Sequence, residues 1–155
     1  MAALSDSIER FIKELLQEDT RIELKRNELA QYFGCANSQI NYVLATRFSM
    51  DRGYLVESRR GGSGYVRVIR ISSSDADLLE TLLDRVGTSI DEESAEAIIH
   101  RIYKLKLISL KEAKLLVACV CRQALNLPTT AKDALRASIL KNALVQVFKN
   151  LREED

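Results

Sequence analysis

The chain of 155 residues contains no tryptophan, one proline and one histidine. A single proline leaves long helices uninterrupted, and the abundant leucine, alanine, lysine and glutamate favour a mainly helical protein. The histidine, His100, has no companion set of aspartate or cysteine residues, so we expect it at the surface and expect no metal site. Because no paired carboxylates and no nucleophile with a matching base stand out, we expect neither a cofactor nor enzymatic activity.

Cysteines are few, and long apolar runs are missing. No stretch of about 18 apolar residues exists, which excludes a membrane span, and the first residues lack the basic region of a secretion signal. An odd number of cysteines in such a chain predicts reduced thiols in the cytoplasm. Cys119 and Cys121 would point about 200° apart on a helix, so they are interpreted as buried structural thiols rather than metal ligands.

Charge and glycine are unevenly distributed along the chain. Residues 20–70 carry nine basic against four acidic residues, whereas the part from residue 72 onwards is almost neutral. Five of the six glycines lie between Gly34 and Gly64. Two domains, residues 1–73 and 74–155, joined near Ser72-Ser73-Ser74, are the simplest explanation of this contrast.

The first domain contains a helix-turn-helix pattern. Apolar spacing predicts helices over residues 5–18 and 26–33 and a further helix behind Asn37, with a short strand at residues 21–24. Ser5 or Ser7 is expected to cap the first helix, and Asn37 or Ser38 the third. A small residue, Ala30, lies four positions before Gly34, which suits two closely crossing helices with a left-handed turn residue between them. This spacing predicts DNA binding, although a plain helical hairpin shares the apolar stripe.

The helix after this turn has an uncharged outer face. Amides there are suited to the base edges of the major groove, and an asparagine pairs bidentately with adenine. The expected base contacts are Ser38, Gln39, Asn41, Tyr42 and Thr46. Basic residues around them are expected to contact phosphates: Lys25, Arg26, Arg47 and Arg52. Local packing or capping by Asn41 and Tyr42 is the alternative interpretation.

Two strand-like segments, residues 54–60 and 65–71, flank a glycine-rich loop and predict a hairpin, the wing of a winged helix. Arginine at a narrow tip suits the minor groove of A·T-rich DNA. The expected wing contacts are Arg59, Arg60, Gly61, Gly62, Ser63, Gly64 and Tyr65. A phosphate-binding nucleotide loop is disfavoured because the lysine-containing motif is missing and a strand follows the loop.

Five short motifs run through this domain: Ser38-Gln39-Ile40-Asn41-Tyr42-Val43, Thr46-Arg47-Phe48, Arg52-Gly53-Tyr54, Val56-Glu57-Ser58, and Arg60-Gly61-Gly62 with Gly64-Tyr65. In these motifs, and in size and domain order, the chain resembles the CtsR family, repressors of class III heat-shock genes in low-GC Gram-positive bacteria. The resemblance implies a dimeric repressor of chaperone and Clp protease genes that binds a double-stranded DNA operator of short direct repeats. It also implies that the wing senses heat, that the arginine kinase McsB modifies wing arginines, with Arg60 the candidate, and that Clp proteases remove the released repressor.

Two residues depart from the family pattern. Ser63 interrupts the glycine run of the wing, so the release temperature does not carry over. Asn37 replaces a proline common in the family, and we expect it to cap the helix through its side chain.

The second domain is predicted as a bundle of four helices. Apolar stripes indicate helices ending at Gly87 and spanning residues 96–107, 110–125 and 131–151. The third is apolar on every face, which predicts burial all round and a homodimer interface, the alternative being a monomeric bundle. The fold class is therefore mainly α with a small β wing, a winged helix-turn-helix domain followed by a four-helix dimerisation domain.

Two other functions remain open at the level of the sequence. One is a winged-helix regulator gated by a small molecule bound in the helical half, which is disfavoured because no polar cluster interrupts the apolar stripes there. The other is a winged helix used only for protein contacts, which would not need five arginines beside an amide-bearing helix.

Overall fold

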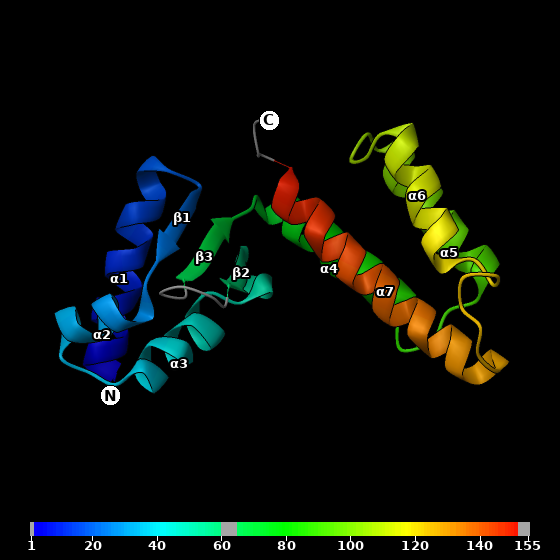
Figure 1. Cartoon of the computed structure of the whole chain (residues 1–155). Coiled ribbons are helices and arrows are strands. Elements are labelled where there is room, and N and C mark those ends of the chain that lie inside the picture. Colours follow the sequence, from blue (N-terminus) through cyan, green and yellow to red (C-terminus); the bar gives the residue numbers. More distant parts are fainter. Residues whose placement is uncertain (1, 60–64, 152–155) are drawn as a thin grey trace. The chain divides into compact units, whose positions relative to one another are not determined.

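The computed structural model describes residues 2–59 and 65–151 (Figure 1). Its contacts divide the chain into two compact units, Met1–Asp77 and Leu78–Asp155. The first unit contains, in order, α1 (Ala2–Glu18), β1 (Arg21–Leu24), α2 (Arg26–Phe33), α3 (Asn37–Arg47), the short 3₁₀ helix η1 (Met50–Arg52), β2 (Tyr54–Arg59) and β3 (Tyr65–Arg70). The second contains the later part of α4 (Ser73–Val86), then α5 (Glu92–Lys104), α6 (Leu110–Val120) and α7 (Thr129–Asn150).

The mainly helical fold class with a small sheet is confirmed. The three strands form an antiparallel sheet in the order β1-β3-β2, and β2 pairs with β3 as the predicted hairpin. Valines of β3, Val66 and Val68, are fully buried, as are Ile8 and Ile12 of α1 and Ile40 of α3. These residues belong to one core that joins the sheet to the three helices.

The turn between α2 and α3 has the predicted geometry. Gly34 lies in the left-handed region at φ 63° and ψ 41°, and the Cys35 backbone N–H donates to the Ala30 carbonyl at 2.9 Å. A Cβ at Gly34 would meet no atom within 4 Å, so the demand for glycine is conformational rather than steric.

The predicted helix caps in this unit are wrong. α3 begins after Ala36, whose side chain has no polar atom, and the Asn37 amide instead donates to Asn27 Oδ1 at 2.7 Å. α1 starts at Ala2, ahead of Ser5, and the Ser7 hydroxyl donates to the Ala3 carbonyl at 2.9 Å. Each residue predicted as a cap lies inside its helix, Asn37 as the first residue of α3 and the serines further along α1 and α3.

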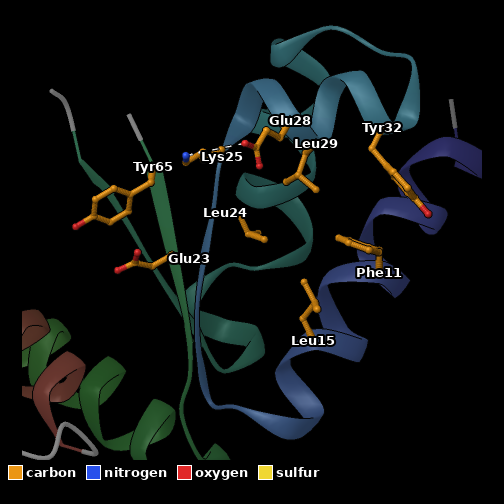
Figure 2. Close-up of a pocket in the computed structure, with 9 residues that line it drawn as sticks. All are labelled: Phe11, Leu15, Glu23, Leu24, Lys25, Glu28, Leu29, Tyr32 and Tyr65. Atoms are coloured by element: carbon orange, nitrogen blue, oxygen red, sulfur yellow. Dashed lines mark ion pairs between the residues drawn. The ribbon is translucent and has the colours of Figure 1, made fainter. Parts of the chain in front are cut away.

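A hollow of about 470 Å³ lies on the first unit between α1, β1 and α2 (Figure 2). Its wall is largely apolar, and Tyr32 contributes an aromatic ring that is 73% exposed. The lining residues are Phe11, Leu15, Glu23, Leu24, Lys25, Glu28, Leu29, Tyr32 and Tyr65.

In the second unit, capping residues set where two helices begin. Asp91 accepts a hydrogen bond from the Ser94 backbone N–H at 2.7 Å, so α5 starts at Glu92, four residues before the predicted position. That bond lowers the pKa of Asp91 below its usual value. Ser109 and Glu112 form a reciprocal capping box at the start of α6.

The prediction for the apolar helix of this unit is wrong about where the helix ends, and within one chain the helix is not buried all round. α6 ends at Val120 rather than Leu125, and only Ala113 and Val120 are buried. Leu115 is 67% exposed, and Cys119, predicted to be buried, is exposed. The reason is geometric: α5 and α7 contact α6, and they leave the stripe of Leu115, Ala118 and Cys119 uncovered within one chain.

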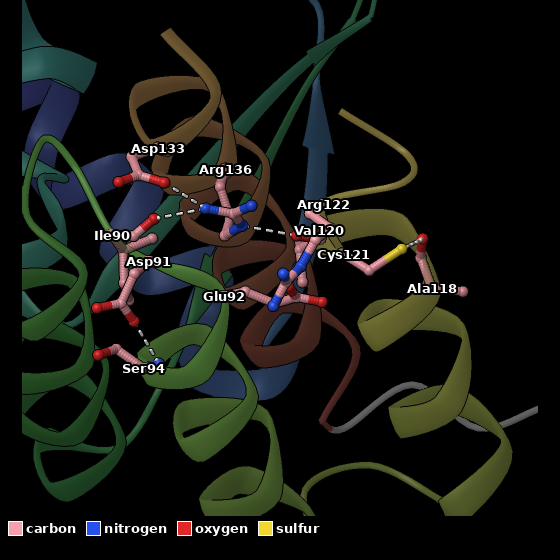
Figure 3. Close-up of polar contacts among 10 residues, drawn as sticks. All are labelled: Ile90, Asp91, Glu92, Ser94, Ala118, Val120, Cys121, Arg122, Asp133 and Arg136. Atoms are coloured by element: carbon pink, nitrogen blue, oxygen red, sulfur yellow. Dashed lines mark hydrogen bonds and ion pairs between the residues drawn. The ribbon is translucent and has the colours of Figure 1, made fainter. Parts of the chain in front are cut away.

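The second unit also holds a buried arginine that the apolar pattern did not reveal (Figure 3). Arg136 of α7 is 2% exposed, and its Nε donates to the carbonyl of Val120, the last residue of α6, at 2.6 Å. Its Nη1 donates to the Ile90 carbonyl at 3.0 Å and to Asp133 Oδ1 at 2.6 Å. One guanidinium therefore ties α7 to the end of α6 and to the segment before α5.

Candidate nucleic-acid interface

The core holds α3 so that one side is buried and the other faces outward. Ile40, Val43 and Leu44 are buried, and Phe48, just after the helix, is 1% exposed. The remaining positions of the first three turns are exposed, and none of them carries a formal charge. An outward face of amides, hydroxyls and a tyrosine on a fixed helix is suited to base edges in a major groove.

The predicted base contacts are all exposed: Ser38, Gln39, Asn41, Tyr42 and Thr46. Tyr42 is 61% exposed, so its ring is not part of the core. Thr46 is less available than the sequence indicates, because its hydroxyl already donates to the Tyr42 carbonyl at 2.7 Å.

Asn41 has a partner that the sequence did not indicate. Its Oδ1 accepts from Arg26 Nε at 2.5 Å, and Arg26 Nη2 donates to Ser58 Oγ of β2 at 2.9 Å. Arg26, the first residue of α2, thereby joins the outward helix to a strand of the wing. No spacing rule could have found this contact, because its partners lie 15 and 32 positions away in the chain.

Arg47 is directed toward α1. Its Nη1 donates to Asp6 Oδ1 at 2.9 Å and to Glu9 Oε1 at 2.5 Å. Hydrogen bonds from Lys13 and then Arg47 lower the pKa of Glu9, and the two carboxylates raise the pKa of Arg47. These pairs secure the carboxyl-terminal end of α3 against α1, and the phosphate contact expected of Arg47 stays a prediction.

The strands of the wing carry a network of alternating charge. Arg67 on the central strand lies opposite Glu23 of β1 and Glu57 of β2. Its Nη2 pairs with Glu23 Oε1 at 2.8 Å, and Arg59 Nη2 pairs with Glu57 Oε1 at 2.9 Å. The half-buried Tyr65 ring lies 5.8 Å from the Arg67 guanidinium. At the base of the wing, arginine charge is thus largely balanced by glutamate.

The other predicted contacts fall into two groups. Lys25 and Arg52 are exposed, and Lys25 Nζ lies 4.0 Å from Glu28 Oε1. The tip of the wing, with Arg60, Gly61, Gly62, Ser63 and Gly64, lies outside the described residues.

A metal centre or a membrane-spanning helix would indicate another class of protein. Among residues 2–59 and 65–151, no three histidine, cysteine, aspartate or glutamate side chains come together as metal ligands would. Over the same ranges, no helix combines the length and apolar character needed to cross a bilayer.

Family models match both halves of the chain. The model described as the CtsR N-terminal HTH domain matches residues 3–72, and that described as the CtsR C-terminal dimerization domain matches residues 74–145.

Full-length relatives are similar over nearly the whole chain. A transcriptional regulator CtsR from Geobacillus stearothermophilus is 41% identical, with 95% of this chain and 98% of that protein covered. The Bacillus subtilis CtsR is 38% identical over 93% of this chain and 96% of its own length. A crystal structure of CtsR in complex with a 26-bp DNA duplex shares 41% identity, covers 93% of this chain and 97% of that chain, and has a TM-score of 0.47.

Proposed function

This chain belongs to the CtsR family of transcriptional regulators, and from that premise we propose that it is a sequence-specific DNA-binding repressor of heat-shock and protein-quality-control genes. Its targets in this proposal are chaperone and Clp protease genes, and it acts in the cytoplasm, where bacterial operators lie. Residues 1–73 bind DNA, and residues 74–155 assemble the dimer.

One observation carries the DNA-binding part of the proposal. The exposed face of α3 is uncharged but rich in hydrogen-bonding groups, and it lies in a domain whose segment 20–70 has a net charge of +5. A helix that faced only solvent would gain from lysine and glutamate there, whereas base edges require amides and hydroxyls. Surrounding positive charge supplies the attraction to phosphates that is independent of sequence.

The proposed contacts follow from this arrangement. Ser38, Gln39, Asn41 and Tyr42 face the major groove, with Thr46 contributing mainly its methyl group. Phosphates are contacted by exposed cations, Lys25 and Arg52 among them. The wing residues 59–65, Arg60 among them, enter the minor groove.

A salt titration tests DNA binding. Affinity for a duplex selected from a randomised pool should fall with salt with a log–log slope of several units, about 0.9 per phosphate neutralised. Competition with unselected duplex should show that the selected sequence binds at least about a thousandfold more tightly. A flat salt dependence, or equal affinity for both duplexes, would contradict the proposal and favour a protein-interaction module.

We propose a homodimer formed through the uncovered face of α6. Leu115, Ala118 and Cys119 share one side of this helix, and all three are exposed in the single chain. A separate hollow of about 500 Å³ lies between α5 and α6, where Leu110 and Val117 line it together with charged residues. Because this half matches a dimerization domain, a second copy of the chain is the occupant that covers the surface. Sedimentation of the full-length protein tests this, with a dimer expected and a stable monomer contradicting it.

Release by heat is assigned to the wing, on the strength of the family resemblance. Ordering a glycine-rich loop on DNA costs about 1–2 kcal/mol of backbone entropy per residue, a cost that rises with temperature. Gly62→Ala should therefore shift the temperature at which the complex dissociates, whereas Arg60→Glu should abolish binding at every temperature. If Gly62→Ala leaves the release temperature unchanged, heat sensing lies elsewhere in the chain. Heating the complex in the absence of any small molecule also separates this repressor from a ligand-gated regulator.

We further propose that the repressor is phosphorylated and then degraded. Phosphorylation of Arg60 would place negative charge beside DNA phosphates and release the operator. McsB is the proposed kinase, and the Clp machinery the proposed route of degradation. Treatment of the bound complex with the kinase should release DNA from the wild type but not from a variant in which Arg60 is lysine.

A further inference from the structure

We infer that Arg26 is a positioning residue that sets which hydrogen-bonding group Asn41 presents to DNA, an inference that rests on the proposed DNA binding. The observation behind it is the pair of hydrogen bonds from one guanidinium to Asn41 on α3 and Ser58 on β2. Arg26 was expected to contact phosphate, and its contacts in the structure point to a different task.

The orientation of the Asn41 amide follows from the chemistry of its partner. Every N–H of arginine is a donor, so only the amide oxygen can face it, and the 2.5 Å contact is from Nε to Oδ1. The amide nitrogen is the other branch of the same planar group and therefore points away from Arg26. Since Asn41 is exposed, its Nδ2 hydrogens are the group offered to a base.

This orientation limits how Asn41 can read a base. Arg26 occupies one of the two lone pairs of Oδ1, so it fixes the direction in which Nδ2 donates and leaves one acceptor position on the oxygen. The fixed Nδ2 donor fits the purine N7, the guanine O6 or the thymine O4, and it rejects the amino group of cytosine. Bidentate recognition of adenine additionally requires the remaining lone pair of Oδ1 at the same base edge.

The second hydrogen bond, to Ser58, links the orientation of the Asn41 amide to β2 of the wing. Nε and Nη2 of one guanidinium project their hydrogens from neighbouring positions of a rigid plane, so Asn41 Oδ1 and Ser58 Oγ are held at a set separation. Both acceptors are neutral, so the cation is not cancelled by them. A lysine keeps the charge but cannot occupy both acceptors in the same fixed geometry.

Three substitutions test the inference in the full-length protein. The probe is the duplex selected by the wild type from a randomised pool, with each base pair then replaced in turn. Arg26→Lys should reduce discrimination at one base pair of each half-site by about tenfold, while the salt slope stays the same because the charge is retained. Asn41→Asp keeps a partner for Arg26 but presents an acceptor, so that same base pair should change its preference toward cytosine or adenine amino groups. Ser58→Ala should weaken discrimination at that position less than Arg26→Lys does.

Lys25→Ala is the matched control, since it removes a neighbouring exposed cation whose ion pair is with Glu28 of α2 rather than with a residue of α3. It should lower the salt slope by about one and leave every base preference intact.

Different outcomes overturn the role of Arg26 and the proposed DNA binding. If Arg26→Lys retains the wild-type preference at every position, or if Arg26→Lys and Asn41→Asp alter different positions, Arg26 is not a positioning residue. Should Arg26→Lys unfold the domain, Asn41→Asp decides alone, because an unchanged preference in that variant overturns the inference. A wild type without any base preference would instead refute the proposed function itself.

Discussion

The two units of this chain differ in where their apolar and polar side chains lie. In the first unit the isoleucines and valines of α1, α3 and β3 are buried, and its outward helix displays amides and hydroxyls. In the second, α6 displays leucine, alanine and cysteine to solvent, while an arginine occupies the interior. The usual distribution, with apolar groups inside and polar groups outside, holds in the first unit and is partly reversed in the second.

This contrast has a physical meaning. A helix face without charge indicates a ligand with its own hydrogen-bonding groups, and an exposed apolar stripe indicates a surface that another apolar surface covers. The outward face of α3 in the first unit is therefore suited to a polar partner. The uncovered face of α6 in the second unit is suited to the second copy of the chain proposed above.

The largest expected effect is on assembly. Leu115→Glu should raise the dissociation constant of the dimer at least about a thousandfold, equivalent to about 4 kcal/mol, because two carboxylates would be buried in an apolar interface. Sedimentation against protein concentration measures the change. Leu127→Glu, at a leucine that is 44% exposed and lies outside α6, is the control and should leave the dimer intact. If both variants dimerise as the wild type does, the interface lies elsewhere.

A somewhat smaller effect, a loss of folding stability, is expected when the buried Arg136 is replaced. Arg136→Ala should destabilise the second unit by about 3 kcal/mol, because the carbonyls of Ile90 and Val120 and the Asp133 carboxylate lose a buried partner. Thermal or chemical denaturation measures it. Arg122→Ala is the control: it removes an ion pair with Glu92 on a side chain that is 74% exposed, and it should change stability little. Equal losses in the two variants would show that burial of Arg136 has no special energetic role.

Alanine substitutions at two matched glycines compare the local stability of the two units. Gly34 and Gly87 have nearly equal φ angles of 63° and 65°, one in each unit. Alanine at either position should cost about 1 kcal/mol through left-handed backbone strain. Hydrogen exchange should show faster local opening around α2 and α3 for Gly34→Ala, and around α4 for Gly87→Ala. Faster exchange in the unsubstituted unit would mean that the two units unfold as one.

The smallest effect concerns acid sensitivity of the first unit. The pKa of Glu9 is lowered by hydrogen bonds from Lys13 and Arg47, so the folded state favours its ionised form. This contribution is fully present above the unfolded pKa near 4.5 and is lost as the pH falls through the lower, folded value. Glu9→Gln should therefore cost less than about 1 kcal/mol at neutral pH, and the difference from the wild type should disappear in acid. A difference that persists below that range would assign the effect to packing rather than charge.

Much of the first unit follows from local patterns. The strand at residues 21–24, the helix at residues 26–33 and the left-handed Gly34 were all predicted from apolar spacing and turn chemistry, and the structure confirms them. These features depend on neighbours within a few positions, which is the range over which sequence periodicity carries information. Helix caps were predicted less well, because a serine or asparagine near the start of a helix is not always the capping residue.

The sequence by itself determined the family, the helix-turn-helix and the hairpin that forms the wing, since motif spacing and period are properties of the chain. The tertiary structure decided what the side chains contact. Arg26 meets Asn41 and Ser58, Arg47 meets α1, and Arg136 enters the interior although arginine is rarely buried. It also decided that α6 is covered on one side only. Contacts of this kind join residues distant in the chain, and they depend on how packed elements bring donors and acceptors together, which no local pattern encodes.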